Sequence, residues 1–312
     1  MMEKVSDYSR RSFVKALSAL TLAPLAVSGA SRDGDAIAKG SRHRILSANI
    51  RVALDEDAEK GFGWEDRKNI CIDVLKKQRA DIICFQEVLG VQNEDLKAAM
   101  PAYFSFGYEG PEMDAHKTGY HGVAKNPIFF STRRYTMISA GTYWLSETPH
   151  IGGSKAWGTA RARHVNWVRL RDKKSGDTFR VLSLHLDHVS QSAREMQAAM
   201  VLSECAQYPD DFIQILAGDF NVSASNAVIE RIKENGWKDT YTEVHGDNEP
   251  GFTVHSFLGE NHPKKDERRK IDFIFTKGNA DAQSASIVKD HRDGKYPSDH
   301  YFVLTEVELK TK

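Results

Sequence analysis

Short apolar runs, typical of buried strands, alternate along this chain with longer segments in which apolar residues recur at helical spacing. Residues 43–50 form the first run, and residues 65–78 follow with Val74 and Leu75 on one face of a predicted helix. Residues 81–87 form the next apolar run. A strand, a helix and a strand in this order predict a crossover unit with parallel strands.

The same order returns in the second half of the chain, where strands are predicted at 179–188 and 212–218 and a helix between them. Met196 and Met200 are expected on the inward face of that helix. The other predicted elements are helices at 92–100 and 225–235 and strands at 103–108, 127–131, 137–145, 164–171, 251–257, 270–276, 285–288 and 301–309. No Pro- or Gly-rich linker separates the halves, so we expect one domain.

Polar residues suited to acid–base chemistry or metal binding stand at or near the ends of these apolar runs. They are Asn49, Glu87, His185, Asp219, Asn221, Asp272, Asp299 and His300. Asp219 and Asn221 follow Gly218, and side chains two apart on a strand share a face, so both can hold one water. An Asx turn explains a single such stretch equally well. The recurrence of the pattern along the chain favours a common rim.

The amino terminus has the pattern of an export signal. Arg10 and Arg11 precede an uncharged apolar run at 16–27, which ends in small residues. This pattern predicts a twin-arginine signal peptide at 1–30, a flexible lead at 31–42 and a domain at 43–312. The run is too short to span a membrane as a helix, and a basic amphipathic start unrelated to export is the alternative. We expect a periplasmic or secreted protein that uses the twin-arginine export machinery.

Composition narrows the classes of partner. The 312 residues contain 43 Lys and Arg against 43 Asp and Glu, so the net charge of zero disfavours a dedicated duplex-binding protein. The three cysteines, Cys71, Cys84 and Cys205, show no C-x-x-C spacing and are expected to be buried free thiols. Nothing in the sequence indicates a stable protein partner, and we expect a monomer.

Six short stretches together resemble the endonuclease/exonuclease/phosphatase superfamily, which includes deoxyribonuclease I. They are Ser47-Ala48-Asn49-Ile50, Phe85-Gln86-Glu87, Ser183-Leu184-His185-Leu186-Asp187-His188, Gly218-Asp219-Phe220-Asn221, Lys270-Ile271-Asp272-Phe273-Ile274 and Ser298-Asp299-His300. The resemblance implies an α/β fold: a four-layer αββα sandwich in which two mixed or antiparallel sheets pack face to face with helices outside. It also implies a hydrolase that acts on phosphate esters.

The resemblance assigns a role to each matched residue. Glu87, Asn49 and Asp299 are the implied metal ligands, and their oxygens suit Mg²⁺, with Mn²⁺ as a second ion that they admit. The implied catalytic residues are Asp219, which activates the attacking water, Asn221, His185 and His300, which contact the phosphate, and Asp272, which orients His300.

Two further residues are assigned to substrate binding. Arg163 lies in an Arg- and Trp-rich segment that can form a phosphate-binding platform, although an ordinary sheet face is the alternative. His255 belongs to a segment, 252–257, that in relatives lies near the active site. With Asn221 and His185, these two complete the predicted contacts to the substrate.

One position departs from the family pattern. Relatives carry a glutamate just before the third strand that pairs with the first histidine, whereas this chain has Gly122-Val123-Ala124-Lys125. Asp187 or Asn126 can replace that partner of His185, or packing alone can hold the ring.

The function predicted from the sequence is an exported, divalent-metal-dependent phosphoesterase that cleaves a mono- or diester by direct attack of water. A nuclease acting on DNA or RNA is one alternative. A catalytically silent binding module of the same fold and a surface protein anchored by an uncleaved signal are the others.

Overall fold

The computed structural model describes residues 41–109, 120–248 and 250–310, which belong to a compact unit of the chain spanning 40–312. The predicted signal peptide at 1–30 and most of the predicted lead lie outside the described residues. Within the described part, no helix is long and apolar enough to cross a membrane.

The described strands form two six-stranded sheets. The first sheet contains β1 (Ser41–Asn49), β2 (Ile82–Gln86), β3 (Tyr103–Phe106), β4 (Ile128–Ser131), β11 (Ala280–Val288) and β12 (Phe302–Leu309), in the order β11-β12-β1-β2-β4-β3. The second contains β5 (Tyr135–Trp144), β6 (His164–Asp172), β7 (Thr178–His185), β8 (Gln214–Asp219), β9 (Lys238–Asp239) and β10 (Asp272–Lys277), in the order β5-β6-β7-β8-β10-β9. The helices are α1 (Asp55–Ala58), α2 (Trp64–Gln78), α3 (Gly90–Ala99), α4 (Gln191–Cys205), α5 (Ala227–Glu234) and α6 (Thr240–His245).

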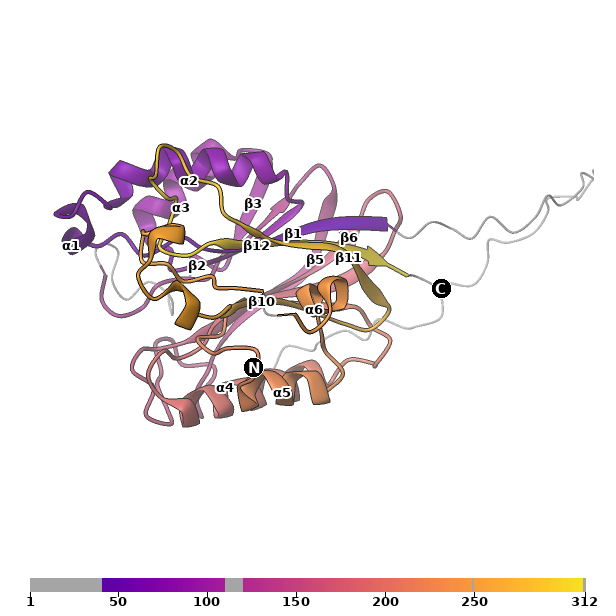
Figure 1. The fold of residues 1–312 in the computed structure, drawn as a ribbon. Coiled ribbons are helices and arrows are strands. Elements are labelled where there is room, and N and C mark those ends of the chain that lie inside the picture. The colour runs from indigo at the N-terminus through magenta and orange to yellow at the C-terminus, as the bar shows by residue number, and fades with distance from the viewer. Residues whose placement is uncertain (1–40, 110–119, 249, 311–312) are drawn as a thin grey trace, which may run out of the picture. The chain divides into compact units, whose positions relative to one another are not determined.

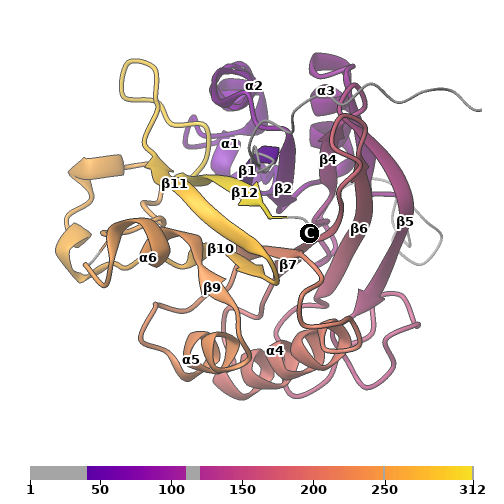
Figure 2. The ribbon, with the colours of Figure 1, turned by 90° about the vertical axis from the view of Figure 1, so that its right-hand side faces the viewer.

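The sheets pack face to face and helices cover their outer faces, which confirms the predicted four-layer sandwich (Figure 1). Helices α2 and α3 lie on the first sheet, and α4 and α5 lie on the second, as the end-on view of Figure 2 also shows. The inner layer is an apolar cluster that includes Ile45, Val181 and Ile215. Burial of each such side chain stabilises the fold by roughly 1.5–3 kcal/mol.

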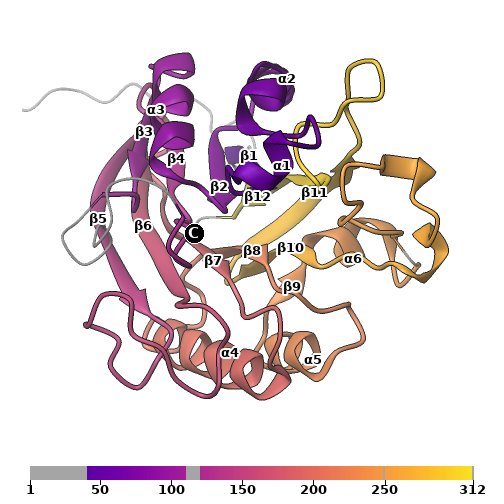
Figure 3. The same ribbon diagram turned by 90° about the vertical axis from the view of Figure 1, so that its left-hand side faces the viewer.

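Each sheet contains one of the two predicted crossover units. Strands β1 and β2 are parallel, as are β7 and β8, whereas the other ladders are antiparallel. The carboxyl ends of these four parallel strands therefore meet at one end of the domain, which faces the viewer in Figure 3.

The inner faces of the sheets become more polar towards that end. On β1 the inward residues run from Ile45 through Ser47 to Asn49, and on β7 a similar series ends in His185. Gln86 joins the two sheets there, because its Nε2 donates to Ser183 Oγ across 3.3 Å. The alternation that buries the core thus also delivers polar groups to the shared end.

Three predicted details are wrong. Strand β1 begins at Ser41, so the predicted lead at 31–42 is two residues too long: Ser41 pairs with Leu309 and Arg42 with Glu308. Residues 251–257 form no strand and make only an isolated bridge, from Val254 to His300.

The third wrong detail is the position of Met196 on the inward face of α4, whereas Met200 is partly buried and packs against the core as predicted. Met196 is 46% exposed, and the buried face contains Ala193, Arg194, Gln197 and Ala198 instead.

Candidate active site

Three neighbouring strands place His185, Asp219 and Asp272 side by side. The parallel ladder pairs His185 with Asp219, and the antiparallel ladder pairs Asp219 with Asp272. Gly218 permits this close pairing, because a Cβ there would lie 2.2 Å from the Leu184 carbonyl oxygen. His185 Nε2 lies 3.3 Å from Asp219 Oδ2 as a result.

The first sheet contributes Asn49 and Glu87 to the same place. Asn49 Nδ2 donates to Glu87 Oε1 and to Asp219 Oδ2, each across 3.1 Å. Glu87 follows β2 with a left-handed φ of 63°, and its Oε2 accepts a hydrogen bond from the Val52 backbone N–H at 3.0 Å. Such a strained backbone at a polar cluster is typical of functional sites.

The segment before β12 adds Asp299 and His300. His300 Nδ1 donates to Asp272 Oδ2 across 3.0 Å, and its Nε2 lies 3.9 Å from Asp219 Oδ2. Asp299 Oδ2 lies 3.7 Å from Arg51 Nη1. The predicted pairing of Asp272 with His300 is thus present in the structure.

Asn221 fixes the Asp219 carboxylate through its backbone. It too has a left-handed φ, of 53°, and its N–H donates to Asp219 Oδ1 across 2.9 Å. Its Nδ2 donates to the Leu186 carbonyl oxygen. These contacts leave the side-chain oxygen of Asn221 without a hydrogen-bond donor among the described residues.

The two histidines have opposite pKa shifts. Burial lowers the pKa of His185 well below its usual value, and the positive charges of Arg163 and His300 add to this. Burial also acts to lower the pKa of His300, but the charge and hydrogen bond of Asp272 outweigh it and raise that pKa well above normal. At neutral pH His185 is therefore neutral and His300 is an imidazolium ion.

The carboxylates also differ. Burial, reinforced by the negative charge of Asp272, raises the pKa of Asp219 to about 7. Burial acts to raise the pKa of Glu87 as well, but His300, the Val52 N–H and Asn49 stabilise its carboxylate and lower the pKa overall. The site thus contains a carboxylate that accepts a proton near neutral pH beside one that stays ionised.

The cluster fits a divalent cation. One oxygen or nitrogen from each of Glu87, His185 and Asp219 lies within 4.8 Å of the others, and the same holds for Asp219, Asp272 and His300. Asp272 Oδ1 is buried without a hydrogen-bond partner among the described residues. Carboxylate oxygens in this number favour a hard cation.

Asn49 occupies its predicted place but presents its nitrogen to the two carboxylates, while its Oδ1 accepts from the Arg51 N–H at 3.0 Å. The partial positive charge of this amide lies where a cation would balance Glu87 and Asp219. For Asn49 to bind a cation, its side-chain oxygen must face the Glu87 and Asp219 carboxylates in place of its nitrogen.

Arg163 reaches the cluster from the residue before β6. Its Nη2 donates to His188 Nδ1 across 3.1 Å, and its charge acts on Glu87 and Asp219. The prediction from sequence did not include His188.

His255 lies beside the Asp299–His300 segment, as predicted for residues 252–257, but its side chain is enclosed and does not take the predicted substrate-binding position. It is fully buried, its ring packs on Tyr296 and Tyr301, and its N–H donates to the Asp299 carbonyl oxygen at 2.8 Å. It therefore supports the Asp299 segment and has no open surface for a substrate.

Neither suggested partner of His185 contacts it. The Asp187 carboxylate accepts from Thr159, Ala160, Val189 and Ser190, and Asn126 Nδ2 donates to the His164 carbonyl oxygen. The carboxylate nearest in the sheet is that of Asp219, whose Oδ2 lies 3.3 Å from His185 Nε2. The family's missing glutamate has no substitute at this position among the described residues.

Arg67 is a supporting residue that sequence reasoning missed. Its guanidinium donates to the carbonyl oxygens of Ile50, Arg51, Phe62 and Pro297. Ile50 and Arg51 directly follow Asn49, and Pro297 lies two residues before Asp299. The signal was present, since Arg67 shares the apolar face of its helix with Ile70 and Cys71.

Comparisons with known proteins agree with this geometry. The sequence model of one protein family, the "Endonuclease/Exonuclease/phosphatase family", matches residues 46–300 of this chain. A protein of that description from Bacteroides vulgatus is 28% identical, with a TM-score of 0.76 over 86% of this chain and 99% of that one. A mannosyl-6-phosphatase from Bacteroides thetaiotaomicron is 26% identical, with a TM-score of 0.75 over 86% and 100%. The uncharacterized protein YbhP of Escherichia coli K12 is 25% identical over 85% of this chain and 96% of its own length.

Proposed function

This chain belongs to the endonuclease/exonuclease/phosphatase family, and from that premise we propose that it is an exported, divalent-metal-dependent phosphoesterase. It hydrolyses a phosphate mono- or diester by direct attack of an activated water. The observation that carries this proposal is the position of Asp219, which lies in register between His185 and Asp272 and shares a hydrogen-bond donor with Glu87 from the opposite sheet.

Asp219 is the proposed general base. Its raised pKa of about 7 suits proton transfer at neutral pH, and the Asn221 N–H fixes its orientation. The His300 imidazolium, held by Asp272, stabilises negative charge that develops on the phosphoryl oxygens. Neutral His185 and the Asn221 side chain provide further polar contacts to the phosphate.

Glu87, Asp299 and Asn49 are the proposed ligands of the divalent cation, with Mg²⁺ as the proposed ion and Mn²⁺ as a substitute. When bound, this cation polarises the phosphoryl group as a Lewis acid. Arg51 balances part of the negative charge at Asp299.

Substrate hydrolysis tests this proposal. Purified protein is assayed with p-nitrophenyl phosphate, bis-p-nitrophenyl phosphate and single-stranded DNA, in Mg²⁺ and in EDTA. We expect Mg²⁺-dependent hydrolysis of at least one substrate and a loss of about 10³-fold in Asp219→Asn, because the general base is removed. The matched control is Asp172→Asn, an equally buried aspartate on β6.

Full activity of Asp219→Asn, or activity unchanged by EDTA, contradicts the proposal. Hydrolysis of DNA alone identifies a nuclease, the alternative function given by the sequence. Metal binding without hydrolysis of any of the three substrates identifies a silent binding module.

Export is proposed from the twin-arginine pattern in residues 1–30 alone. Cell fractionation followed by mass spectrometry of the mature amino terminus tests it. We expect periplasmic or secreted protein that lacks this segment.

A further inference from the structure

Arg163 lacks the carboxylate or carbonyl partners that satisfy three other buried or partly buried arginines, Arg180, Arg51 and Arg67. Arg180 is fully buried and forms two hydrogen bonds with the Glu204 carboxylate, at 2.7 and 2.8 Å. Arg51 binds the Asp57 carboxylate, and Arg67 donates to four carbonyl oxygens. The Arg163 guanidinium has a single hydrogen-bond partner within the described ranges, the neutral ring of His188.

This lack of a counter-ion is costly at a partly buried position. Burial lowers the pKa of Arg163, and no carboxylate of the described chain lies within ion-pair distance of it, although Glu87 and Asp219 act on it from farther away. A partly desolvated guanidinium with free donors is a receptor for an anion. Since the catalytic carboxylates repel anions, Arg163 provides a compensating positive charge beside them.

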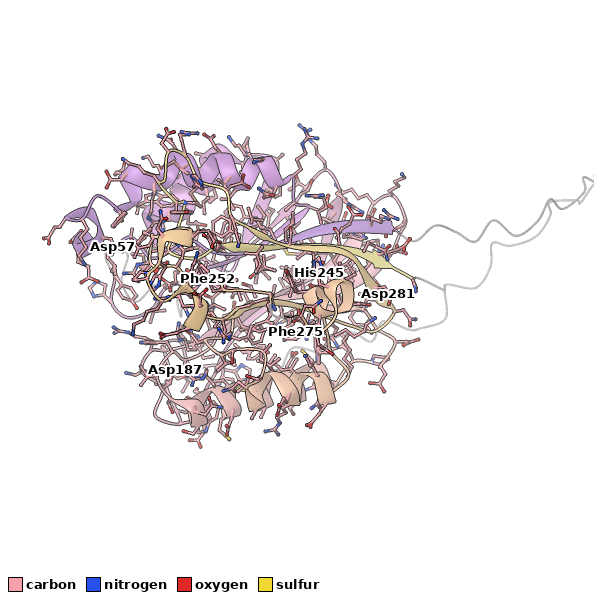
Figure 4. All side chains as sticks on the ribbon, in the orientation of Figure 1. Asp57, Asp187, His245, Phe252, Phe275 and Asp281 are labelled. Carbon is pink, nitrogen blue, oxygen red and sulfur yellow. The ribbon has the colours of Figure 1, made fainter. Side chains whose placement is uncertain are left out.

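The receptor is also held rigidly. Asp187, which is fully buried, accepts hydrogen bonds from Thr159 and Ala160 on one side and from Val189 and Ser190 on the other. Asp187 therefore fixes the loop that leads to Arg163, and it also fixes His188, the residue that follows Asp187 in the sequence. Figure 4 labels Asp187 at the left-hand end of the domain, together with Asp57.

His188 orients the guanidinium. A guanidinium has no acceptor, so His188 Nδ1 must accept from Arg163 Nη2 and the ring must be neutral. Burial and the charge of Arg163 lower the pKa of His188, which agrees with this state.

We infer that the Arg163–His188 pair binds the third terminal oxygen of a phosphate monoester and so makes the enzyme selective for monoester dianions over diesters. A monoester presents three terminal oxygens and nearly two negative charges at pH 7, whereas a diester presents two such oxygens and one charge. An added fixed cation therefore stabilises the monoester more. This inference rests on the proposed function.

The experiment compares kcat/KM for p-nitrophenyl phosphate and bis-p-nitrophenyl phosphate at saturating Mg²⁺. Arg163→Met should lower the monoester value by about 100-fold or more and the diester value by less than about 5-fold. The control is Arg169→Met, which removes a partly buried arginine from β6, six residues away, and should leave the ratio unchanged. Melting temperatures establish that each variant is folded.

His188 acts as a positioning residue and is tested by rescue. His188→Ala should lower the monoester value by about 10-fold, and His188→Asn should restore most of it, because the Asn oxygen can accept from Arg163. A purely structural role predicts similar losses for both variants and for both substrates.

Calorimetry provides a readout that does not depend on turnover. With Mg²⁺ present, inorganic phosphate should bind the wild type more tightly than dimethyl phosphate, and Arg163→Met should weaken phosphate binding at least 10-fold. If the wild type hydrolyses neither ester but phosphate binding depends on Arg163, the proposed function fails and the anion receptor stands. If both esters are hydrolysed and Arg163→Met affects them equally, or if only the diester is hydrolysed, the inference is overturned while the proposed function stands.

Discussion

The two ends of the sandwich both contain buried histidine and aspartate side chains, but these have their hydrogen-bond partners at one end and, among the described residues, lack some of them at the other. At the far end, defined by Ser41, His43, Tyr135, Asp172 and Asp177, His43 Nδ1 accepts from Tyr135 OH at 2.6 Å and its Nε2 contacts Ser41 Oγ at 2.7 Å. At the site end, one oxygen of the Asp272 carboxylate has no hydrogen-bond partner in the described part of the chain, and the pKa of Asp219 is raised.

The two ends also differ in how their carboxylates are balanced by positive charge. Arg134 at the far end lies between Asp81 and Asp172, at 2.7 and 2.9 Å, so each carboxylate has a cation. At the site end, several carboxylates share His300 and Arg51, and Arg163 has no carboxylate at ion-pair distance within the described chain. The far end is a satisfied structural network, whereas the site end retains unbalanced charge that a cation and a phosphate can neutralise.

The largest effect is expected when the pairing of Asp272 with His300 at the site end is weakened. Asp272→Asn removes the charge that keeps His300 protonated, so kcat should fall by roughly 10²–10³-fold, and the pKa of His300 measured by NMR should fall as well. An unchanged His300 titration contradicts the assigned role of Asp272.

Stabilisation of the fold by a bound metal should depend on carboxylates of the site end alone. Mg²⁺ at about 100 times its Kd should stabilise the fold by roughly 2.7 kcal/mol, seen as a rise in melting temperature. Glu87→Gln should abolish most of this rise, and Glu306→Gln, which alters a carboxylate paired with Arg42, should not. Equal rises in both variants indicate that the cation binds elsewhere.

A smaller effect, in pH dependence, should come from the far end. Burial lowers the pKa of His43 to about 3, with Arg134 adding to the shift. The unfolded chain, with an ordinary histidine pKa near 6.5, binds the proton first, so the stabilisation is complete above that pH and is lost as pH falls towards 3.

Between pH 7 and pH 5, His43 should therefore account for a loss of about 2 kcal/mol. Chemical denaturation of the wild type and of His43→Gln measures it, and the variant should lose correspondingly less. Parallel pH profiles of the two proteins contradict a neutral, buried His43.

Local alternation was enough to predict most strands and the convergence of polar strand ends. Asn49, His185, Asp219 and Asp272 each lie at the end of an apolar run, and a period of two determines the face on which they lie. The roles given to them came from the family resemblance.

Tertiary contacts override local pattern where prediction failed. Residues 251–257 alternate like a strand, but the His255 and Ser256 N–H groups donate to the Asp299 carbonyl oxygen, and Ser256 and Phe257 have left-handed φ. The inward face of α4 is polar in part because Arg194 and Gln197 hydrogen-bond the backbone of Asp187. Neither arrangement can be inferred from a period of apolar residues.

The pairing of Ser41 with Leu309 places the first residue of β1 and the last residue of β12 next to each other at the far end. A support, label or fused carrier attached at either position is thereby separated from the site end by the length of β1. Immobilised protein should turn over dissolved substrate as freely as protein in solution.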